Sequence, residues 1–193
     1  GTIDPNHPGV NYLFNHTNNN YISGKLMPID SNKYFDFTHL RKTPQEVRDL
    51  FQLNNWNDVI AFQTRNPMHR AHFELTRLAM EEHNAKLLIH PFIGISKPGD
   101  IDHFTRVKCY QHIIKHYPKN SVELSLINLA MRMAGPKEAL WHAIIRRNYG
   151  CNHIIVGRDH AGPGLDAEGK LYYQPYDAQE IISQYQEELE IKM

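Results

Sequence analysis

Two hydrophobic patterns alternate along the chain. Short apolar runs rich in β-branched residues predict buried strands at 59–62, 86–93, 122–127 and 153–157. Between and beyond them, apolar residues recur at helical spacing and predict helices at 43–54, 67–82, 107–117, 136–149 and from 177 onward. Strands that alternate with helices of this length indicate right-handed βαβ units. We therefore expect an α/β protein with a Rossmann-like open parallel sheet and helices on both faces.

The spacing of apolar residues also predicts which helix faces are buried. In the second predicted helix the apolar stripe consists of Ala71, Leu75, Leu78 and Ala79. In the helix that follows Pro136 it consists of Leu140, Trp141, Ile144 and Ile145. We expect both stripes in the core, and the neighbouring pair Arg146 and Arg147 in solvent.

The two ends of the chain have weaker patterns. Residues 1–36 are rich in Asn, Pro and Gly without a sustained period, which predicts turns and short extended pieces. The character changes at Thr43, where Thr43, Pro44 and Glu46 predict a capping box that opens a helix. Residues 189–193 are typical of a strand that has just started.

Composition and charge narrow the class of protein. The 193 residues suffice for one substantial core, and 41% hydrophobic residues are ordinary for a globular protein. Lys plus Arg equals Asp plus Glu at 21 each, so no overall field recruits nucleic acid or an anionic membrane, and any anion site must be local.

Cysteine use and the absence of apolar spans bear on the compartment. Cys109 and Cys151 form neither a disulfide framework nor a zinc-type spacing, which favours a reducing compartment, the cytoplasm. No apolar run is long enough to span a bilayer, and no secretory signal opens the chain. Because the chain begins at Gly1, an organellar targeting segment is left open.

The junction between the first strand and its helix carries the chemistry. Asn66 and Pro67 predict a cap and a first helical residue, so we expect the helix to begin near Pro67. Free amides at a helix start attract anions, and Arg65 adds a positive charge beside them. Gln63 and Thr64 add neutral hydrogen-bonding groups, and together these groups suit phosphate or sulfate.

His69 and His72 are three residues apart, so they lie on the same side of the predicted helix. One interpretation is that both imidazoles contact phosphate oxygens as charge accumulates on them. The alternative is a metal pair, but H-x-x-H supplies only two ligands where zinc needs three or four from the protein.

An H-x-x-H pair after a buried strand resembles the signature of the nucleotidylyltransferase superfamily. Three strings, QTRNPMHRAH at 63–72, KPGDIDH at 97–103 and GRDHAGPG at 157–164, together resemble the ATP sulfurylase (sulfate adenylyltransferase) family. The resemblance implies that 1–36 is the remnant of a β-rich N-terminal domain, and that 37–193 is a catalytic domain shortened at its C-terminal end. It also implies a homo-oligomeric parent protein.

The resemblance further implies transfer of the AMP moiety of ATP to sulfate, with Mg²⁺ carried in with ATP and no dedicated carboxylate cage. The catalytic positions it implies are Thr64, Arg65, Asn66, His69 and His72. Sulfate would contact Gln63, Arg65 and the backbone amide of Ala161. Nucleotide would contact Gln63, Thr64, Arg65, Asn66, Gly157, Arg158, Asp159 and His160, with glycines at 157, 162 and 164 allowing close approach.

The role of residues 97–103 and the activity of the chain each have more than one interpretation. Residues 97–103 resemble a loop over the site with Gly99 as a pivot, whereas Pro98 and Gly99 equally explain a plain surface turn. The chain is alternatively a domain that binds nucleotide or sulfate without turnover. A third hypothesis is a related adenylyltransferase with another acceptor, which Q-T-R and G-R-D-H-A-G-P-G disfavour.

Overall fold

A parallel four-stranded sheet forms the centre of the computed structural model, which describes residues 2–27, 29, 34–94 and 101–193. The strands are β1 (Val59–Phe62), β2 (Lys86–Ile89), β3 (Val122–Leu124) and β4 (His153–Ile154), in the order β3-β2-β1-β4. In register, Ile60 of β1 lies opposite Leu87 of β2 and His153 of β4. The predicted α/β class with a parallel sheet is confirmed.

The strands are shorter than their apolar runs predict. After β2 the chain reaches Pro91, which has no N–H to donate to a ladder, and only an isolated parallel bridge between Phe92 and Ile127 continues the pairing. At the end of the chain the predicted strand is reduced to a bridge between His153 and Lys192, and Leu189 still belongs to the last helix.

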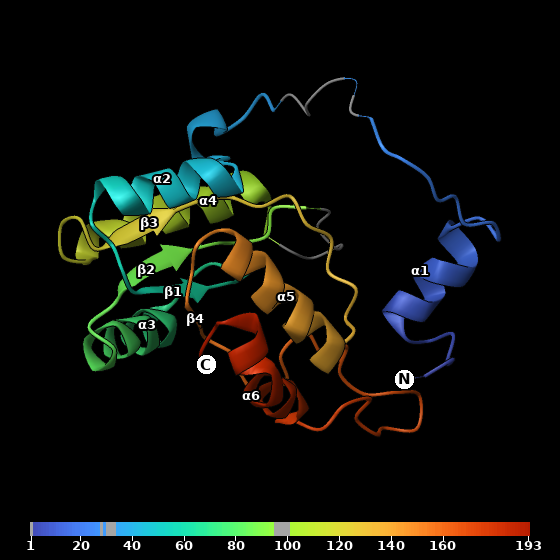
Figure 1. Ribbon diagram of the computed structural model, residues 1–193. Helices are drawn as coiled ribbons and strands as arrows, with labels where there is room; N and C mark the ends of the chain where they lie inside the picture. Colours follow the sequence, from blue (N-terminus) through green and yellow to red (C-terminus); the bar gives the residue numbers. More distant parts are fainter. Residues whose placement is uncertain (1, 28, 30–33, 95–100) are drawn as a thin grey trace.

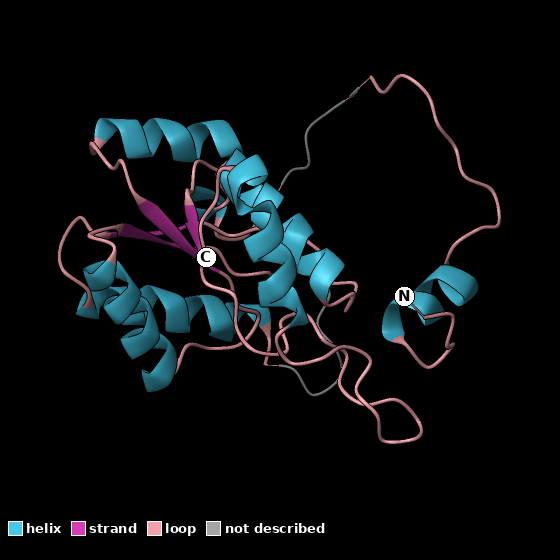
Figure 2. Cartoon of the chain, turned by 60° about the horizontal axis from the view of Figure 1, so that its bottom comes forward, coloured by secondary structure: helices cyan, strands magenta, loops and turns pink. Residues whose placement is uncertain are grey.

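Helices cover both faces of the sheet (Figures 1 and 2). One face carries α3 (Arg70–Glu82) and α4 (His103–Ile113), the latter continued by a 3-10 turn, Ile114–His116. The other carries α2 (Pro44–Leu53), α5 (Pro136–Asn148) and α6 (Asp177–Leu189). None of the described helices is long and apolar enough to cross a membrane.

Alternation along β1 explains why both faces are covered. Ile60 and Phe62 point to the core shared with α3 and α4, whereas Val59 and Ala61 point to the core shared with α2, α5 and α6. All four residues are buried, as expected of a central parallel strand. The capping box of α2 is also confirmed, because Thr43 Oγ1 accepts from the Glu46 N–H and the Glu46 carboxylate accepts from the Thr43 N–H.

The N-terminal region contains a helix that its sequence pattern does not predict. Helix α1 (Pro8–His16) is capped by His7, whose Nδ1 accepts from the Gly9 N–H at 3.1 Å. It lies away from the sheet in Figure 1 and packs on a later loop, where the Arg132 guanidinium sits 4.7 Å from the Tyr12 ring. The expectation of only turns and extended pieces was therefore wrong for this segment, and the domain boundary at 36 stays a prediction.

The predicted apolar face of α3 was wrong. Leu75 and Leu78 are 46% and 54% exposed, whereas Thr76 and Met80 are buried. Thr76 is tolerated inside because its hydroxyl shares a 2.6 Å hydrogen bond with that of Tyr117.

The predicted face of α5 was also wrong, and here the buried face is polar. Trp141 and Ile144 are more than one-third exposed. The buried residues of α5 are Glu138, Ala139, His142, Ala143 and Arg146. The two alanines allow close packing on the sheet, and the three polar residues follow one another at intervals of four along one side. Arg146 is fully buried, contrary to expectation, while the side chain of Arg147 is 42% exposed and pairs with Glu190.

Candidate functional site

The order of the strands creates a crevice at the carboxyl edge of the sheet. The chain runs from β1 outward to β2 and β3 and then returns to place β4 on the other side of β1. Ligands bind in open α/β sheets at such a switch point, outside the carboxyl ends of the strands. The loops after β1 and β4, which hold two of the predicted motifs, both leave the sheet there.

Gln63 and His160 join these two loops. The Gln63 side-chain Nε2 lies 2.9 Å from Nε2 of His160 and 2.8 Å from Nδ1 of His142 on α5. The two ring nitrogens are themselves 3.1 Å apart. The structure thus brings together two predicted site residues and adds His142, which the sequence reasoning missed.

Glu138 supports His142 from the start of α5. Its carboxylate accepts the backbone N–H groups of Arg132 and Ala134 at 2.8 and 2.9 Å. Its Oε1 is also 3.4 Å from Nε2 of His142, a long contact but the only acceptor that any described residue offers to that atom. A neutral His142 therefore carries its proton on Nε2 and presents Nδ1 as an acceptor to the Gln63 amide.

The imidazoles of His142 and His160 are neutral at neutral pH, because the fold lowers the pKa of both. Burial lowers the pKa of His142, outweighing the opposing effect of the Glu138 carboxylate, which faces its Nε2 as an acceptor. Burial, His142 and Arg146 together lower the pKa of His160 to about 4. The pKa of Glu138 stays below its ordinary value, because hydrogen bonds from His142 and the two backbone amides outweigh its burial. The site at neutral pH therefore contains neutral imidazoles and one buried carboxylate.

Helix α4 holds the loop after β1 by its backbone. Arg106 Nη1 donates to the carbonyls of Arg65 at 2.6 Å and Phe92 at 3.1 Å. The Tyr110 hydroxyl donates to the Asn66 carbonyl at 2.8 Å, and burial raises the pKa of Tyr110, so the phenol stays protonated. Neither residue was singled out from sequence, where both read as ordinary helix positions.

These contacts explain why α3 begins later than predicted. Thr64 Oγ1 donates to the Asn66 carbonyl and accepts from the Asn66 N–H, so residues 64–66 form a tight turn instead of a cap. The helix begins at Arg70 with His69 at the capping position, and its free amides lie three residues beyond the predicted place. Asn66 is therefore not the cap, and Pro67 is not the first helical residue.

His69 and His72 do lie side by side. Their rings stack with centroids 3.9 Å apart, and His69 is exposed as expected. Burial and the neighbouring His69 lower the pKa of His72, whose Nδ1 is buried without a partner among the described residues. No group of three or more metal-ligating side chains occurs within the described ranges.

Other predicted residues differ in how they are placed. The Arg65 side chain is partly buried and has no carboxylate partner among the described residues. The side chain of Arg158, in contrast, is 69% exposed, and its Nε lies 3.4 Å from the carboxylate of Asp159.

The loop after β4 presents a free backbone group. Asp159 and Ala161 both adopt a left-handed backbone at φ 55°, an uncommon conformation for residues other than glycine. The Ala161 carbonyl accepts from the Gly135 N–H at 3.1 Å, while the Ala161 N–H has no partner within the described part of the chain. Gly164, at φ 97°, is required by its own backbone, whereas a Cβ built on Gly157 would meet no atom of the described residues within 4 Å.

Of the predicted third loop, residues 97–100, including the pivot Gly99, lie outside the described residues. Asp102 caps α4 by accepting from the Thr105 N–H at 3.0 Å. The next residue, His103, contacts Asp36 with its Nε2 at 2.7 Å.

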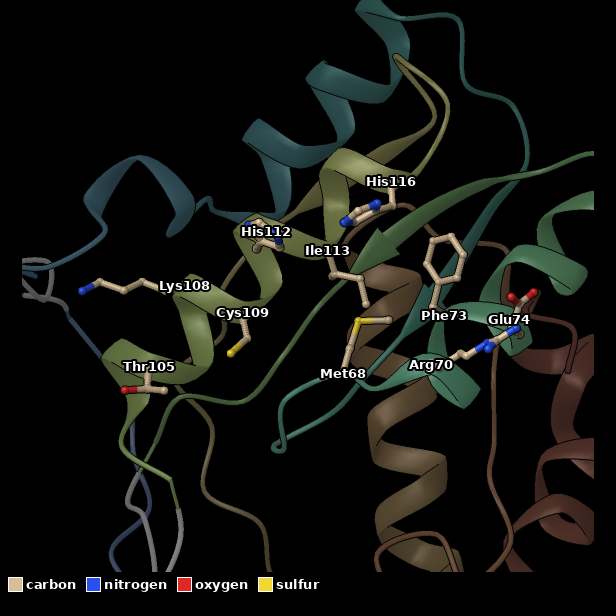
Figure 3. A pocket seen from close by; sticks show the side chains of 10 residues that line it. All are labelled: Met68, Arg70, Phe73, Glu74, Thr105, Lys108, Cys109, His112, Ile113 and His116. Atoms are coloured by element: carbon tan, nitrogen blue, oxygen red, sulfur yellow. The ribbon is translucent and has the colours of Figure 1, made fainter.

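Two cavities lie near these elements. The smaller, about 190 Å³, is bordered by Asp159, His160 and Gly162 of the loop after β4 and by Tyr173. The larger, about 840 Å³, lies between α3 and α4, where Cys109 and Ile113 face Met68 and Phe73 (Figure 3). None of the predicted site residues lines the larger cavity, so its size does not mark the site.

Comparisons with known proteins show to which family the chain belongs. The sequence model of the ATP-sulfurylase family matches residues 38–193. The chain is 58% identical over 191 residues to the sulfate adenylyltransferase of Schizosaccharomyces pombe, and 57% identical over 190 residues to that of Saccharomyces cerevisiae. These alignments cover 99% and 98% of the chain but only 39% and 37% of the relatives, so the chain spans less than two-fifths of their length.

A solved structure, a hexameric APS kinase from Thiobacillus denitrificans, has a TM-score of 0.66 to the chain with 29% identity. The match covers 83% of the chain and 29% of that protein. The family match extends over the sheet, its helices and both loops of the crevice. The chain belongs to the ATP-sulfurylase family.

Proposed function

We propose that the chain is the nucleotide- and sulfate-binding part of a sulfate adenylyltransferase. The reaction transfers the AMP moiety of MgATP to sulfate. A sulfate oxygen forms a bond to the α-phosphorus, the bond from that phosphorus to the bridging oxygen of the β-phosphate breaks, and pyrophosphate leaves with the electron pair. The products are adenosine 5′-phosphosulfate and pyrophosphate.

The contact between Gln63 and His160 carries the proposal. It joins the two motif loops at the switch point of the sheet, so one ligand can touch both. Sulfate is already a dianion, and pyrophosphate is a competent leaving group, so positioning and charge stabilisation are the main tasks.

The roles proposed for the other residues follow from their free groups. Within the described ranges, Arg65 has no carboxylate partner and the N–H of Ala161 has no acceptor, so the positive charge and the donor both suit sulfate. The stacked His69 and His72, at the start of α3, suit the phosphates, where the free amides of the helix add to them. Thr64 and Asn66, held in a turn, are proposed to lie beside the nucleotide.

Magnesium enters this proposal as part of the substrate. The described residues contain no cluster of three or more metal-ligating side chains. Phosphate oxygens and water complete the coordination of Mg²⁺ in many ATP sites, which fits an ion that arrives as MgATP.

The test uses the protein that is encoded by the complete reading frame containing this chain, as wild type and as Arg65→Ala. Its sulfate-dependent release of pyrophosphate is measured. We expect loss of at least about a hundredfold in kcat/KM for sulfate, because a charge-assisted contact in a water-poor site is removed. Arg77→Ala, on the surface of α3 where Arg77 pairs with Glu74 and Glu81, is the matched control and should stay near wild type.

Other outcomes distinguish the alternatives. If the protein encoded by the complete reading frame binds nucleotide in calorimetry but does not turn it over, the binding-domain hypothesis is selected. Release of pyrophosphate only with an acceptor other than sulfate would select a related adenylyltransferase. An active enzyme in which Arg65→Ala and Arg77→Ala behave alike would refute the proposed site.

A further inference from the structure

Arg146 is a buried cation directly behind the crevice. It follows Glu138 and His142 on the polar side of α5 and has no exposed surface. Its guanidinium donates only to backbone carbonyls, those of His90 at 3.3 Å and His142 at 3.4 Å, and it lies 4.9 Å from the centroid of the Phe92 ring. A buried arginine normally pairs with a carboxylate.

No such carboxylate is present around Arg146 among the described residues. No ion pair includes it, its Nε is buried without a hydrogen-bond partner, and no carboxylate contributes to its pKa, which burial lowers to about 10 against the opposing effects of Cys151 and Tyr149. It therefore remains charged at neutral pH. Glu138, the buried carboxylate of the same helix, lies two turns earlier and is already engaged by two backbone amides and by His142.

The position of Arg146 connects it to both motif loops. His142, one turn before it, contacts Gln63 and His160 by Nδ1. Phe92, under its guanidinium, donates its N–H to the Thr64 carbonyl at 2.9 Å and has its ring 4.9 Å from that of His142. Arg146 thus lies one layer behind the residues proposed to touch the ligand.

We infer that Arg146 is a positioning residue whose counter-charge is the bound oxyanion. Its fixed positive charge, screened little in the interior, raises the affinity of the crevice for sulfate and phosphate without touching them. The imidazoles of His142 and His160 stay neutral, because protonation there is opposed by burial and by Arg146 itself, so they neither add to its positive charge nor cancel it. The inference rests on the proposed function for the identity of the anions.

The test compares Arg146→Met, Arg146→Lys and Arg147→Met. Arg147 is the next residue on the same helix, exposed and paired with Glu190, so its replacement removes the same charge from the surface. Binding of sulfate and of α,β-methylene ATP is measured by calorimetry, and thermal unfolding is measured without ligand. Arg146→Met should weaken binding about tenfold, as expected for one unit charge acting across a protein interior.

The thermal stability of Arg146→Met should not fall together with its affinity for anions. Removal of an unpaired buried charge leaves Arg146→Met at least as resistant to heat as Arg147→Met, and Arg146→Lys should retain most of the affinity. Equal binding by Arg146→Met and Arg147→Met would overturn the inference. So would a joint loss of affinity and heat resistance in both Arg146 variants, since that is the signature of a packing role.

If the wild-type chain binds neither ligand, the proposed function fails, and the inference is decided by thermal unfolding with increasing sulfate or phosphate at constant ionic strength. A stabilisation by these anions that Arg146→Met lacks would support it. An equal response of wild type and Arg146→Met would overturn it.

Discussion

The side chains of Gln63 and His160 are 97 residues apart in sequence, and their Nε2 atoms lie 2.9 Å apart in space. Each lies in a loop that leaves the sheet from one of two neighbouring parallel strands, β1 and β4. His142 and Glu138, behind them on α5, fix the direction of the Gln63 amide. The crevice is therefore organised from inside the protein before any ligand arrives.

Replacement of Gln63 by Glu tests the neutral character of this point. The variant keeps the shape of the side chain but places a carboxylate where sulfate is proposed to bind. Two negative charges in direct contact repel each other by several kcal/mol. We expect kcat/KM for sulfate to fall by about a hundredfold or more, with a smaller change in the KM for ATP. Steady-state kinetics of the complete reading frame measures both, and Gln52→Glu on the exposed side of α2 is the control. Unchanged sulfate kinetics in Gln63→Glu would remove Gln63 from the site.

Glu138→Gln tests the support beneath His142. A glutamine oxygen can accept one of the N–H groups of Arg132 and Ala134, but its NH₂ then faces the other donor. We expect a loss of about 1–3 kcal/mol in the free energy of unfolding, because a buried donor loses its partner. Urea denaturation measures it, with the exposed Glu187→Gln on α6 as control. A variant as stable as this control would show that the Glu138 contacts are not structural.

Tyr110→Phe removes the hydroxyl that donates to the Asn66 carbonyl. The loss of one buried hydrogen bond predicts a decrease of about 1 kcal/mol in the free energy of unfolding. The larger effect should be on kcat, because the 64–66 turn loses one of its two anchors to α4 while the fold is retained. Denaturation and steady-state kinetics are compared with Tyr185→Phe, a half-exposed position on α6. A drop in stability equal to that of the control, with kcat unchanged, would contradict this role.

Acid should destabilise the protein through its buried histidines. The pKa of His160 falls to about 4 in the folded chain, below its ordinary value of 6.5, so the unfolded chain binds more protons between these values. The contribution of His160 to stability is therefore complete above about pH 6.5 and is lost as the pH falls toward about 4, by up to about 3 kcal/mol. Burial lowers the pKa of His142 and of His90 as well, which adds to the effect.

Urea denaturation at about pH 7.5 and about pH 5 measures this dependence in wild type and in His160→Asn. The variant should lose less stability on acidification, whereas His39→Asn, at an exposed position, should follow the wild type. Identical pH dependence in wild type and His160→Asn would show that His160 is not held neutral by the fold.

Local sequence patterns predicted those elements whose structure depends on residues close together in the sequence. The alternation of apolar runs and helical spacings predicted the parallel sheet, and the Thr43 capping box was confirmed in detail. The start of α3 was missed because Tyr110, 44 residues away, captures the Asn66 carbonyl, and no local rule reports such a contact. The polar face of α5 was missed because its partners lie outside the helix: His142 and Arg146 meet the Gln63 side chain and the His90 carbonyl, 79 and 56 residues away. Glu138 accepts from backbone N–H groups of the segment just before the helix.

One signal in α5 could have been used. Glu138, His142 and Arg146 recur at intervals of four, which places them on one side of a helix, opposite Trp141 and Ile144. An amphipathic pattern does not say which side faces the protein, and hydrophobicity favoured the wrong one. The site residues on the two loops came from the resemblance of their motifs, and their ligand contacts stay predictions.

A crystal structure of the chain with adenosine 5′-phosphosulfate tests the central claim most directly. The account predicts the sulfuryl group between the Arg65 guanidinium, the Gln63 side chain and the Ala161 N–H, with the nucleotide phosphate near His69 and His72 at the carboxyl edge of β1 and β4. Ligand density in the cavity between α3 and α4, lined by Met68 and Cys109, with an empty crevice between the two loops would contradict it.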